Sequence, residues 1–428
     1  MEREYKDSGT KGIGLIPQSW DNRQLGIFFS ENKKANSNLE SVTALQFKYG
    51  EIIQKPNNGR DLSDKDKELL SKYTVIEPGD VIVNGLNLNF DLKSLRIAIA
   101  RENGIITSAY IVLKPRKGVN PNYYNYVLKA LDFQKILHGM GEGIRLTLSY
   151  DELKKLNVPA PAASIQSVIV DYLDKKCGEI DSLISLQEQM IEKLKAYKQS
   201  VITEAVTKGL DPNAKLVPSG IDWIKEIPEG WKVLPVKRMC QNITDGSHFS
   251  PNTAGEGKAY ITVSNVYNDE VHVDEAAKIS IDDFSVLVAN GCQPPIGSVL
   301  LAKDGTVGRT AVVQDNDYVV LSSLGILTPL GTVLSKYLKY LLDSDPLQAQ
   351  MQLAMAGSAL RRITITKICK LIGIQPPLSE QKAIITHLDD KCSDIDHLIA
   401  LKQQKIETLK SYKKSVIYEA VTGKTTIE

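Results

Sequence analysis

Apolar residues recur at alternating steps of four and three along two long stretches of the chain. The first series is Leu173, Cys177, Ile180, Ile184, Ile191, Leu194, Val201 and Ala205. The second series is Leu388, Cys392, Ile395, Ile399, Ile406, Leu409, Val416 and Ala420. Such a narrow apolar stripe is typical of a coiled coil and predicts that each stretch pairs with another helix. Two surface helices on separate globular cores are the alternative interpretation.

Polar residues interrupt both series at the same two heptad positions. They are Gln187 and Lys198 in the first series and Lys402 and Lys413 in the second. Polar side chains in a coiled-coil seam weaken the pairing, but they select its register and its partner.

The two helical stretches are copies of one another. Residues 173–207 and 388–422 are identical at 23 of 35 positions, with a constant offset of 215. A repeat of this kind indicates two similar halves, each ending in a helix of about 40 residues, or roughly 60 Å. Because the chain order is lobe, helix, lobe, helix, the helices would pack antiparallel. The predicted fold is α+β, with two globular lobes related by a pseudo-twofold axis and separated by a long antiparallel two-helix coiled coil.

The repeat also opens each half and precedes each helix. The openings are Ser8-Gly9, Ile13, Ile16-Pro17 and Trp20, matched at an offset of 211 by Ser219-Gly220, Ile224, Ile227-Pro228 and Trp231. The stretches before the helices are Leu148-Ser149 with Pro161, and Ile363-Thr364 with Pro376. Between these matched segments the sequences of the two lobes look unrelated, so we expect the lobes to perform different versions of one function.

Short β-rich runs and late helical patterns indicate mixed lobes. The β-rich runs are 80–83, 97–100 and 111–113, then 260–263, 299–301 and 311–313, and the helical patterns are 123–137 and 333–351. This mixture predicts α+β lobes of about 150 residues. The predicted divisions are a first lobe at 1–162, a first repeated helix at 163–207, a linker at 208–218, a second lobe at 219–377 and a second repeated helix at 378–423.

Composition is that of an ordinary folded protein. The chain has 428 residues, 42% of them hydrophobic, and no apolar run of 18 residues that would span a membrane. Its polar N-terminus lacks the apolar stretch of a signal peptide, and its five cysteines form no CxxC pair. We therefore expect a cytoplasmic protein with reduced thiols.

The net charge of the chain does not by itself indicate a nucleic-acid partner. It is +1 for the chain; Lys and Arg number 21 against 17 Asp and Glu in residues 1–150, and 14 against 16 in residues 219–370. A DNA-binding face would require the charges of each lobe to be segregated on one side.

Motifs of catalysis and metal binding are lacking. Gly423-Lys424-Thr425-Thr426 resembles the end of a phosphate-binding loop, but that loop needs a glycine where Tyr418 stands. The five histidines have no metal-ligand spacing with one another or with the cysteines. The Asp/Asn-Pro-Pro-aromatic motif of an adenine methyltransferase is also missing. We therefore predict that the chain alone catalyses nothing and holds neither a metal nor a cofactor.

The duplicated I-P-x-x-W openings, the segment Pro377–Ile384 and the duplicated long helix carry a family resemblance. Together they resemble type I restriction-modification specificity subunits over nearly the whole chain. The first copy departs from this pattern, because Ser164-Ile165-Gln166-Ser167 stands where the second copy has Ser379-Glu380-Gln381-Lys382. A role for Glu380 would therefore belong to the second copy alone.

The resemblance implies a DNA sequence-specificity subunit whose lobes are two target-recognition domains. Each domain would read one half of an asymmetric bipartite sequence in double-stranded DNA. The repeated helices would set the spacing of the half-sites and dock two methyltransferase subunits, and through them motor and nuclease subunits. S-adenosylmethionine, ATP and Mg²⁺ would belong to these partners, as would methyl transfer and ATP-dependent cleavage.

Residue types that read base edges or hold phosphates give the candidate DNA-binding set. In the first lobe the candidates are Asn84, Asn87, Asn89, Lys93, Arg96 and Arg145. In the second lobe they are Ser247, His248, Lys303, Arg309, Arg361 and Arg362. The arginine pair is favoured because the small residues 357–359 beside it would let a DNA backbone approach closely.

Several helix residues outside the seam are also identical in the two copies. We predict that they bind the methyltransferase subunits, because two equivalent surfaces for two copies of one partner would hold them constant. They are Asp181, Lys195, Tyr197 and Glu204 in the first helix and Asp396, Lys410, Tyr412 and Glu419 in the second.

Two other classes of function stay open on sequence grounds. One is a non-catalytic coiled-coil scaffold whose lobes bind protein or glycan. The other is a nuclease or methyltransferase with unrecognised motifs. Salt-dependent binding to duplex DNA separates the DNA-reading hypothesis from the scaffold. Methyl transfer or cleavage by the isolated chain would support the enzyme.

Overall fold

The computed structural model describes residues 4–48, 50–56, 63–88, 95–141, 146–221, 223–249, 251–355 and 361–427. The chain divides into two compact units. Unit 1 comprises Met1–Gln187 and Gln404–Glu428, and unit 2 comprises Glu188–Gln403. Each unit therefore contains one lobe and one part of each long helix. Among the described residues, no helix is long and apolar enough to cross a membrane.

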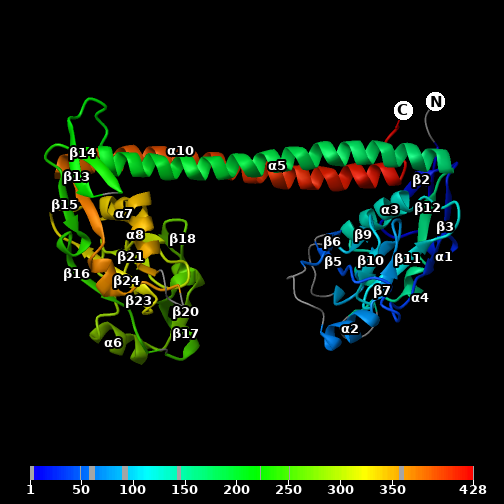
Figure 1. The fold of residues 1–428 in the computed structure, drawn as a ribbon, viewed down its shortest axis with the longest axis horizontal. Coiled ribbons are helices and arrows are strands. Elements are labelled where there is room, and N and C mark those ends of the chain that lie inside the picture. The colour runs from blue at the N-terminus through cyan, green and yellow to red at the C-terminus, as the bar shows by residue number, and fades with distance from the viewer. Residues whose placement is uncertain are drawn as a thin grey trace. The chain divides into compact units, whose positions relative to one another are not determined.

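Two long helices are continuous over the predicted repeats (Figure 1). Helix α5 spans Ala163–Lys208 and helix α10 spans Leu378–Val421. In unit 1 the start of α5 shares a hydrophobic core with the end of α10, and in unit 2 the end of α5 shares one with the start of α10. The two helices thus pair antiparallel within each unit, as predicted.

The predicted apolar series forms the buried stripe of both helices. Every member of the two series is buried or half-buried. Gln187 is also buried, and Lys198, Lys402 and Lys413 are half-buried. The prediction of a heptad seam with polar interruptions is therefore confirmed.

Two of the polar seam residues make equivalent ion pairs between the helices. In unit 1, Nζ of Lys413 lies 2.7 Å from a carboxylate oxygen of Asp181. In unit 2, Nζ of Lys198 lies 2.7 Å from a carboxylate oxygen of Asp396. The carboxylates are more than half exposed, so we expect each pair to contribute about 1 kcal/mol or less. Their main effect is to fix the register of α5 against α10.

The lobe of unit 1 is built on a four-stranded antiparallel sheet in the order β4-β11-β8-β9. Its strands are β4 (Phe29–Glu31), β11 (Ile111–Pro115), β8 (Val81–Val83) and β9 (Ile97–Ile99). The remaining elements are β1 (Tyr5–Asp7), β2 (Leu15–Pro17), β3 (Asp21–Gln24), α1 (Leu25–Phe28), β5 (Leu45–Lys48), β6 (Glu51–Gln54), α2 (Asp64–Ser71), β7 (Thr74–Ile76), β10 (Gly104–Ile106), α3 (Pro121–Phe133), α4 (Tyr150–Leu153) and β12 (Asn157–Ala160).

The lobe of unit 2 is built on an antiparallel sheet in the order β16-β24-β21-β22. Its strands are β16 (Cys240–Asp245), β24 (Leu324–Pro329), β21 (Val299–Ala302) and β22 (Thr310–Val312). The remaining elements are β13 (Leu216–Ile221), β14 (Ile224–Pro228), β15 (Lys232–Pro235), β17 (Thr253–Ile261), β18 (Val266–Tyr267), β19 (Glu270–Val271), β20 (Ala277–Ile279), α6 (Ile281–Ala289), β23 (Tyr318–Val320), α7 (Ser335–Asp343), α8 (Asp345–Met355), α9 (Ile365–Cys369) and β25 (Ile372–Gln375).

The repeat extends into the lobes, although their sequences look unrelated. In both main sheets the strands lie in the order first, fourth, second, third along the chain, and a helix follows the fourth strand. That helix is α3 in unit 1 and α7 in unit 2. The α+β lobes are therefore two versions of one scaffold.

Paired tyrosines fasten this helix in the same way in both units. The hydroxyl of Tyr126 in α3 donates to Asp174 of α5 at 2.6 Å, and the hydroxyl of Tyr340 in α7 donates to Asp389 of α10 at 2.8 Å. One turn earlier on each helix, a second and fully buried tyrosine donates to a carbonyl of the strand before the long helix. These bonds are Tyr123 to Pro159 of β12 and Tyr337 to Ile374 of β25. These bonds fix each lobe to its own end of the helix pair.

The I-P-x-x-W openings pack against the ends of the long helices. Gly209 and Gly423 follow the C-terminal turns of α5 and α10 with positive φ angles, a conformation that favours glycine. A Cβ on Gly209 would crowd Trp231, and one on Gly423 would crowd Trp20. In unit 2 the indole N–H of Trp231 also donates to Glu380 at 2.9 Å. Ile165 occupies the position of Glu380 in the first copy, so this bond belongs to unit 2 alone.

The charges that face the helix pair differ between the units. In unit 2, Asp269 at the tip of the β18–β19 hairpin lies 2.8 Å from Lys339 and 3.8 Å from Lys198. In unit 1, Lys129 of α3 lies near Lys413, and burial together with that neighbouring charge lowers the pKa of Lys129. Lys198 therefore lies near two carboxylates in unit 2, whereas Lys413 lies near one carboxylate and a second lysine in unit 1.

This difference predicts unequal effects of the same charge reversal. Lys198→Glu would place a carboxylate beside Asp396 and Asp269, whereas Lys413→Glu would gain attraction to Lys129. We expect Lys198→Glu to destabilise the protein by about 1 kcal/mol, or about 2–4 °C in Tm, and Lys413→Glu to do less. Differential scanning calorimetry measures both. Adding Asp396→Lys to Lys198→Glu should recover part of the loss; equal shifts without recovery would contradict the assignment.

Candidate nucleic-acid interface

The candidate DNA-binding residues that the structure describes gather at one edge of the main sheet in each unit. In unit 1 this edge carries residues 84–88, which follow β8, and residues 95–96, which enter β9. In unit 2 it carries residues 245–249 after β16 and residues 303–309 between β21 and β22. Asn89, Lys93 and Arg145 lie outside the described residues.

The same backbone bond closes this edge in both units. The amide of Leu148 donates to the carbonyl of Gly85 at 2.9 Å, and the amide of Ile363 donates to the carbonyl of Lys303 at 2.9 Å. Leu148 and Ile363 are equivalent in the repeat, each two residues before the short helix that leads to the long one. The loop after β8 in unit 1 and the loop after β21 in unit 2 are therefore held by the same backbone hydrogen bond, while their side chains differ.

Arg96 is placed differently from the sequence-based expectation. Only 2% of its surface is exposed, so it does not present its guanidinium to DNA as a base or phosphate contact. Its guanidinium donates to the carbonyls of Asn84, Leu86 and Asn87 at 2.9, 2.7 and 3.1 Å. Three carbonyl partners satisfy a buried charge that would otherwise be strongly disfavoured. Arg96 is therefore a positioning residue for the loop at 84–87.

This loop presents two of the candidate amides. Asn84 is half-buried, and its side-chain oxygen accepts from the amide of Leu86 at 3.2 Å. Asn87 is exposed and has a φ of 50°, a left-handed conformation that asparagine tolerates better than most residues. Of the unit 1 candidates described, Asn87 is thus the side chain most available to a partner.

In unit 2, Asp245 at the end of β16 contacts two of the candidate residues. Nζ of Lys303 lies 2.8 Å from Asp245, and Nε2 of His248 lies 3.3 Å from it. Lys303 is 3% exposed, which corrects its assignment as a direct DNA contact, whereas the His248 side chain is 71% exposed. Ser247 is likewise buried, and its hydroxyl donates to the carbonyl of Phe249 at 2.6 Å. Lys303 and Ser247 therefore shape the edge, and His248 is available on it.

The arginine pair has two different environments. Arg362 forms a two-point contact with Asp304, with Nε at 2.7 Å and a second guanidinium nitrogen at 3.1 Å from the carboxylate oxygens. Arg361 is exposed and has no ion-pair partner among the described residues, and its carbonyl accepts from the amide of Gly305. Arg309 is exposed at the end of the loop 303–309, which also contains Asp304 and Gly305. The small residues 357–359 lie outside the described residues.

The predicted partner-binding residues are all exposed, but two of them have another reason to be identical. Asp181 and Asp396 are the carboxylates of the interhelical ion pairs, so the pairing of α5 with α10 accounts for their preservation. Lys195 and Lys410 pair with glutamates one turn earlier on their own helices, at 2.9 and 3.0 Å. Tyr197 and Tyr412, at 56% and 54% exposed, have no such use within the helix pair.

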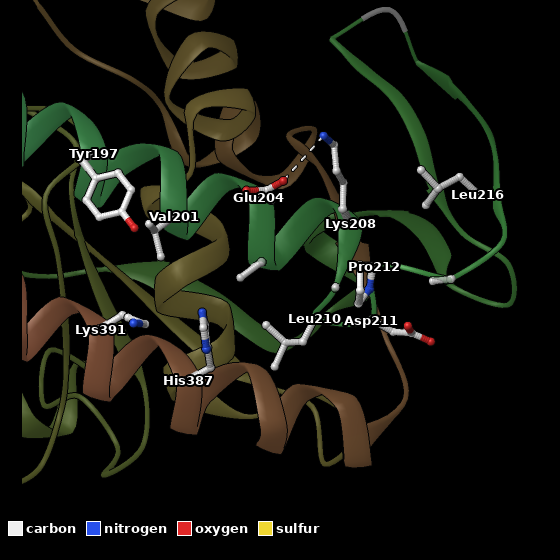
Figure 2. A pocket seen from close by; sticks show the side chains of 13 residues that line it. Tyr197, Val201, Glu204, Lys208, Leu210, Asp211, Pro212, Leu216, His387 and Lys391 are labelled. Carbon is white, nitrogen blue, oxygen red and sulfur yellow. Dashed lines mark ion pairs between the residues drawn. The ribbon is translucent and has the colours of Figure 1, made fainter.

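Tyr197 and Glu204 line a groove at the end of α5 in unit 2 (Figure 2). The groove has a volume of about 550 Å³ and lies between α5, the start of α10 and the segment that follows α5. Its lining includes Val201, Lys208, Leu210, Asp211, Pro212, Leu216, His387 and Lys391. Residues 216–218 of the predicted linker belong to strand β13, which forms one wall of this groove.

Several lining residues recur in unit 1 at an offset of 215. Tyr197, Val201, Glu204 and Lys391 correspond to Tyr412, Val416, Glu419 and Lys176. Tyr197 and Glu204, two of the exposed residues that are identical in the two copies, therefore lie near the end of α5, and their counterparts lie near the end of α10. Elsewhere, among the described residues, no three His, Cys, Asp or Glu side chains are grouped to hold a metal ion.

Comparison with known proteins gives consistent similarities. Residues 228–411 match the family model of the type I restriction modification DNA specificity domain. The chain is 23% identical to a putative type I restriction enzyme MjaX specificity subunit of Methanocaldococcus jannaschii, over 98% of this chain and 97% of that protein. It is 22% identical to the type I restriction enzyme StySPI specificity subunit of Salmonella potsdam, over 97% of this chain and 91% of that protein.

A solved structure shares the fold. The match is to a chain from work on the complex assembly and conformational transition of the type I R-M system, with a TM-score of 0.66 and 16% identity. It covers 95% of this chain and 98% of that chain. The two-lobe α+β architecture is therefore one already seen in a solved protein.

Proposed function

We propose that this chain is a type I restriction-modification specificity subunit and that it reads a bipartite DNA target, one half with each unit. The observation that carries the proposal is the duplicated sheet edge. Both units hold the loop after β8 or β21 with the same backbone bond, yet they place different polar side chains on it. One scaffold with two sets of side chains suits an asymmetric target.

The chemistry of the two edges supports base reading. Unit 1 offers the amides of Asn84 and Asn87, and an asparagine amide can pair with both the N6 and N7 positions of adenine. Unit 2 offers His248, Arg309 and Arg361, which can donate to guanine or to phosphates. Buried ion pairs and carbonyl contacts hold the supporting loops in place, so little order would have to be gained on binding.

A scaffold that binds protein or glycan is less well supported by these features. Exposed asparagine, histidine and arginine side chains at the same edge of both lobes suit an anionic, base-bearing ligand. We propose that the chain is non-catalytic and that methyl transfer with S-adenosylmethionine, and ATP- and Mg²⁺-dependent cleavage, occur on partner subunits.

We further propose that the groove at the end of α5 and the surface formed by the equivalent residues at the end of α10 each dock one methyltransferase subunit. The supporting observation is that exposed residues without a role in the helix pair are identical at these two places. Tyr197 and Tyr412 leave more than half of their surface exposed, a large aromatic area of the kind enriched at protein interfaces. Motor and nuclease subunits would then join through the methyltransferases.

The half-site assignment predicts separable effects of two substitutions. Asn87→Ala should weaken discrimination in one half-site only, and Arg361→Ala in the other half-site only. Loss of one good base contact is expected to reduce selectivity by about 1–3 kcal/mol, or roughly 5- to 150-fold. Methylation rates of duplexes altered in one half at a time measure this in the assembled complex.

Lys232→Ala is the matched control, because Lys232 is exposed on β15, away from the main sheet of unit 2. It should leave selectivity unchanged. If Asn87→Ala and Arg361→Ala impaired the same half-site, the assignment of one half to each unit would be wrong.

The docking assignment predicts a change in stoichiometry. Tyr197→Ala and Tyr412→Ala should each reduce the number of bound methyltransferase subunits from two to one, and the double variant should bind none. Native mass spectrometry of the co-expressed complex reads this number directly. Glu188→Ala, at an exposed position of α5 outside the groove, should retain two subunits. Retention of two subunits by the double tyrosine variant would refute docking at these two surfaces.

A further inference from the structure

An exposed aromatic ring stands on the sheet edge of unit 2. Phe249 follows His248 in the segment after β16, and 61% of its surface is exposed. Single exposed apolar residues are common on proteins and by themselves indicate nothing. The backbone that carries Phe249, however, is hydrogen-bonded to two buried residues.

Three hydrogen bonds fix the main chain of Phe249. Its amide donates to the hydroxyl oxygen of Ser247 at 3.0 Å. Its carbonyl accepts from the same Ser247 hydroxyl at 2.6 Å and from the hydroxyl of Tyr260 at 3.2 Å. Ser247 and Tyr260 are themselves buried, so the ring is presented from a packed base rather than from a free loop.

The residues before Phe249 are fastened to the neighbouring strand. The amide of Ser247 donates to the carbonyl of Val320 at 2.8 Å, and its carbonyl accepts from the amide of Ser322 at 2.9 Å. Gly246 packs so closely that a Cβ there would overlap the backbone of Val320. The chain at 246–249 is therefore held against the end of β23 by backbone hydrogen bonds and close packing.

The charges around this segment come from Asp245 and from two arginines on a neighbouring segment. Asp245 at its start is engaged by Lys303 and faces the exposed ring of His248. Arg361 and Arg362 lie on the segment that pairs with the adjoining loop through the bridge between Asp304 and Arg362. Asp245 and Asp304 are compensated by Lys303 and Arg362, and Arg361 remains available to a phosphate. On duplex DNA, an exposed apolar ring beside it can contact the base stack and the thymine methyl groups.

We propose that Phe249 is a wedge that inserts at a base step of the half-site read by unit 2. Aromatic and aliphatic wedges partly unstack a base step, and the unstacking opposes insertion. A flexible loop would be pushed aside by that opposing force, whereas the bonds to Ser247, Tyr260 and Val320 hold this one. Phe249 would thus make the target sensitive to how easily one step unstacks, in addition to the base edges read nearby. This inference rests on the proposed DNA-reading function.

The test uses the assembled complex and duplexes that contain its methylation target, with 2-aminopurine placed at each step of the target in turn. Insertion of the ring should raise 2-aminopurine fluorescence at one step in the half-site of unit 2. Phe249→Ala should abolish the rise and weaken binding about tenfold. Phe249→Trp should retain the rise. Ile281→Ala, at a residue of α6 that is 66% exposed, is the matched control and should behave like the unaltered chain.

Each other outcome overturns the wedge in a distinguishable way. Absence of any fluorescence rise in a complex that binds its target selectively would refute insertion and leave the DNA-reading function intact. Loss of selective binding by the unaltered complex would refute the proposed function itself. If replacing thymine by uracil matched the effect of Phe249→Ala without unstacking, Phe249 would contact a methyl group. If Phe249→Ala instead released a methyltransferase subunit, the ring would belong to a protein interface.

Discussion

The antiparallel pairing of α5 and α10 is the constraint on which the rest of the structure depends. The core of unit 1 includes Leu173 and Cys177 from α5 together with Val416 and Ala420 from α10. The core of unit 2 includes Ala205 from α5 together with Leu388 and Cys392 from α10. The largest core of each unit therefore needs both helices, and removal of these residues from water is the dominant favourable contribution to folding. The exposed side chains at the sheet edge of each lobe take no part in this packing, so they can differ between the units.

Within each lobe, the packing that both units share is separate from the exposed side chains that differ between them. The tyrosine bonds to α5 and α10, the packing of Trp20 and Trp231, and the strand order of the main sheet recur in both units. The sheet edge carries asparagines in one unit and histidine and arginines in the other. Buried groups such as Arg96 and Lys303 hold that edge without facing outward. If these exposed residues read DNA as proposed, specificity can change through them while the packing that fixes their positions is kept.

Much of this scaffold could be predicted from the sequence, because its causes are local and periodic. The heptad series specifies the seam, and the 215-residue offset specifies two equivalent helices in antiparallel order. The pseudo-twofold relation of the α+β lobes could be predicted, but their shared strand order could not, because tyrosines spaced three apart on a short helix give no strong signal without the bonds they make. The ion pairs of Lys198 and Lys413 were also not foreseen, although the interruptions they cause were. Residue type alone could not separate Arg96 and Lys303 from Arg361, since burial depends on loops distant in sequence.

The central claim is that this chain determines which DNA sequence is methylated by its complex. Single-molecule sequencing of modified bases in the source organism, with and without this chain, tests it most directly. The account predicts that one bipartite adenine-methylation motif disappears when the chain is removed and returns when it is restored. An unchanged set of methylated motifs, in cells that express an active partner methyltransferase, would contradict it.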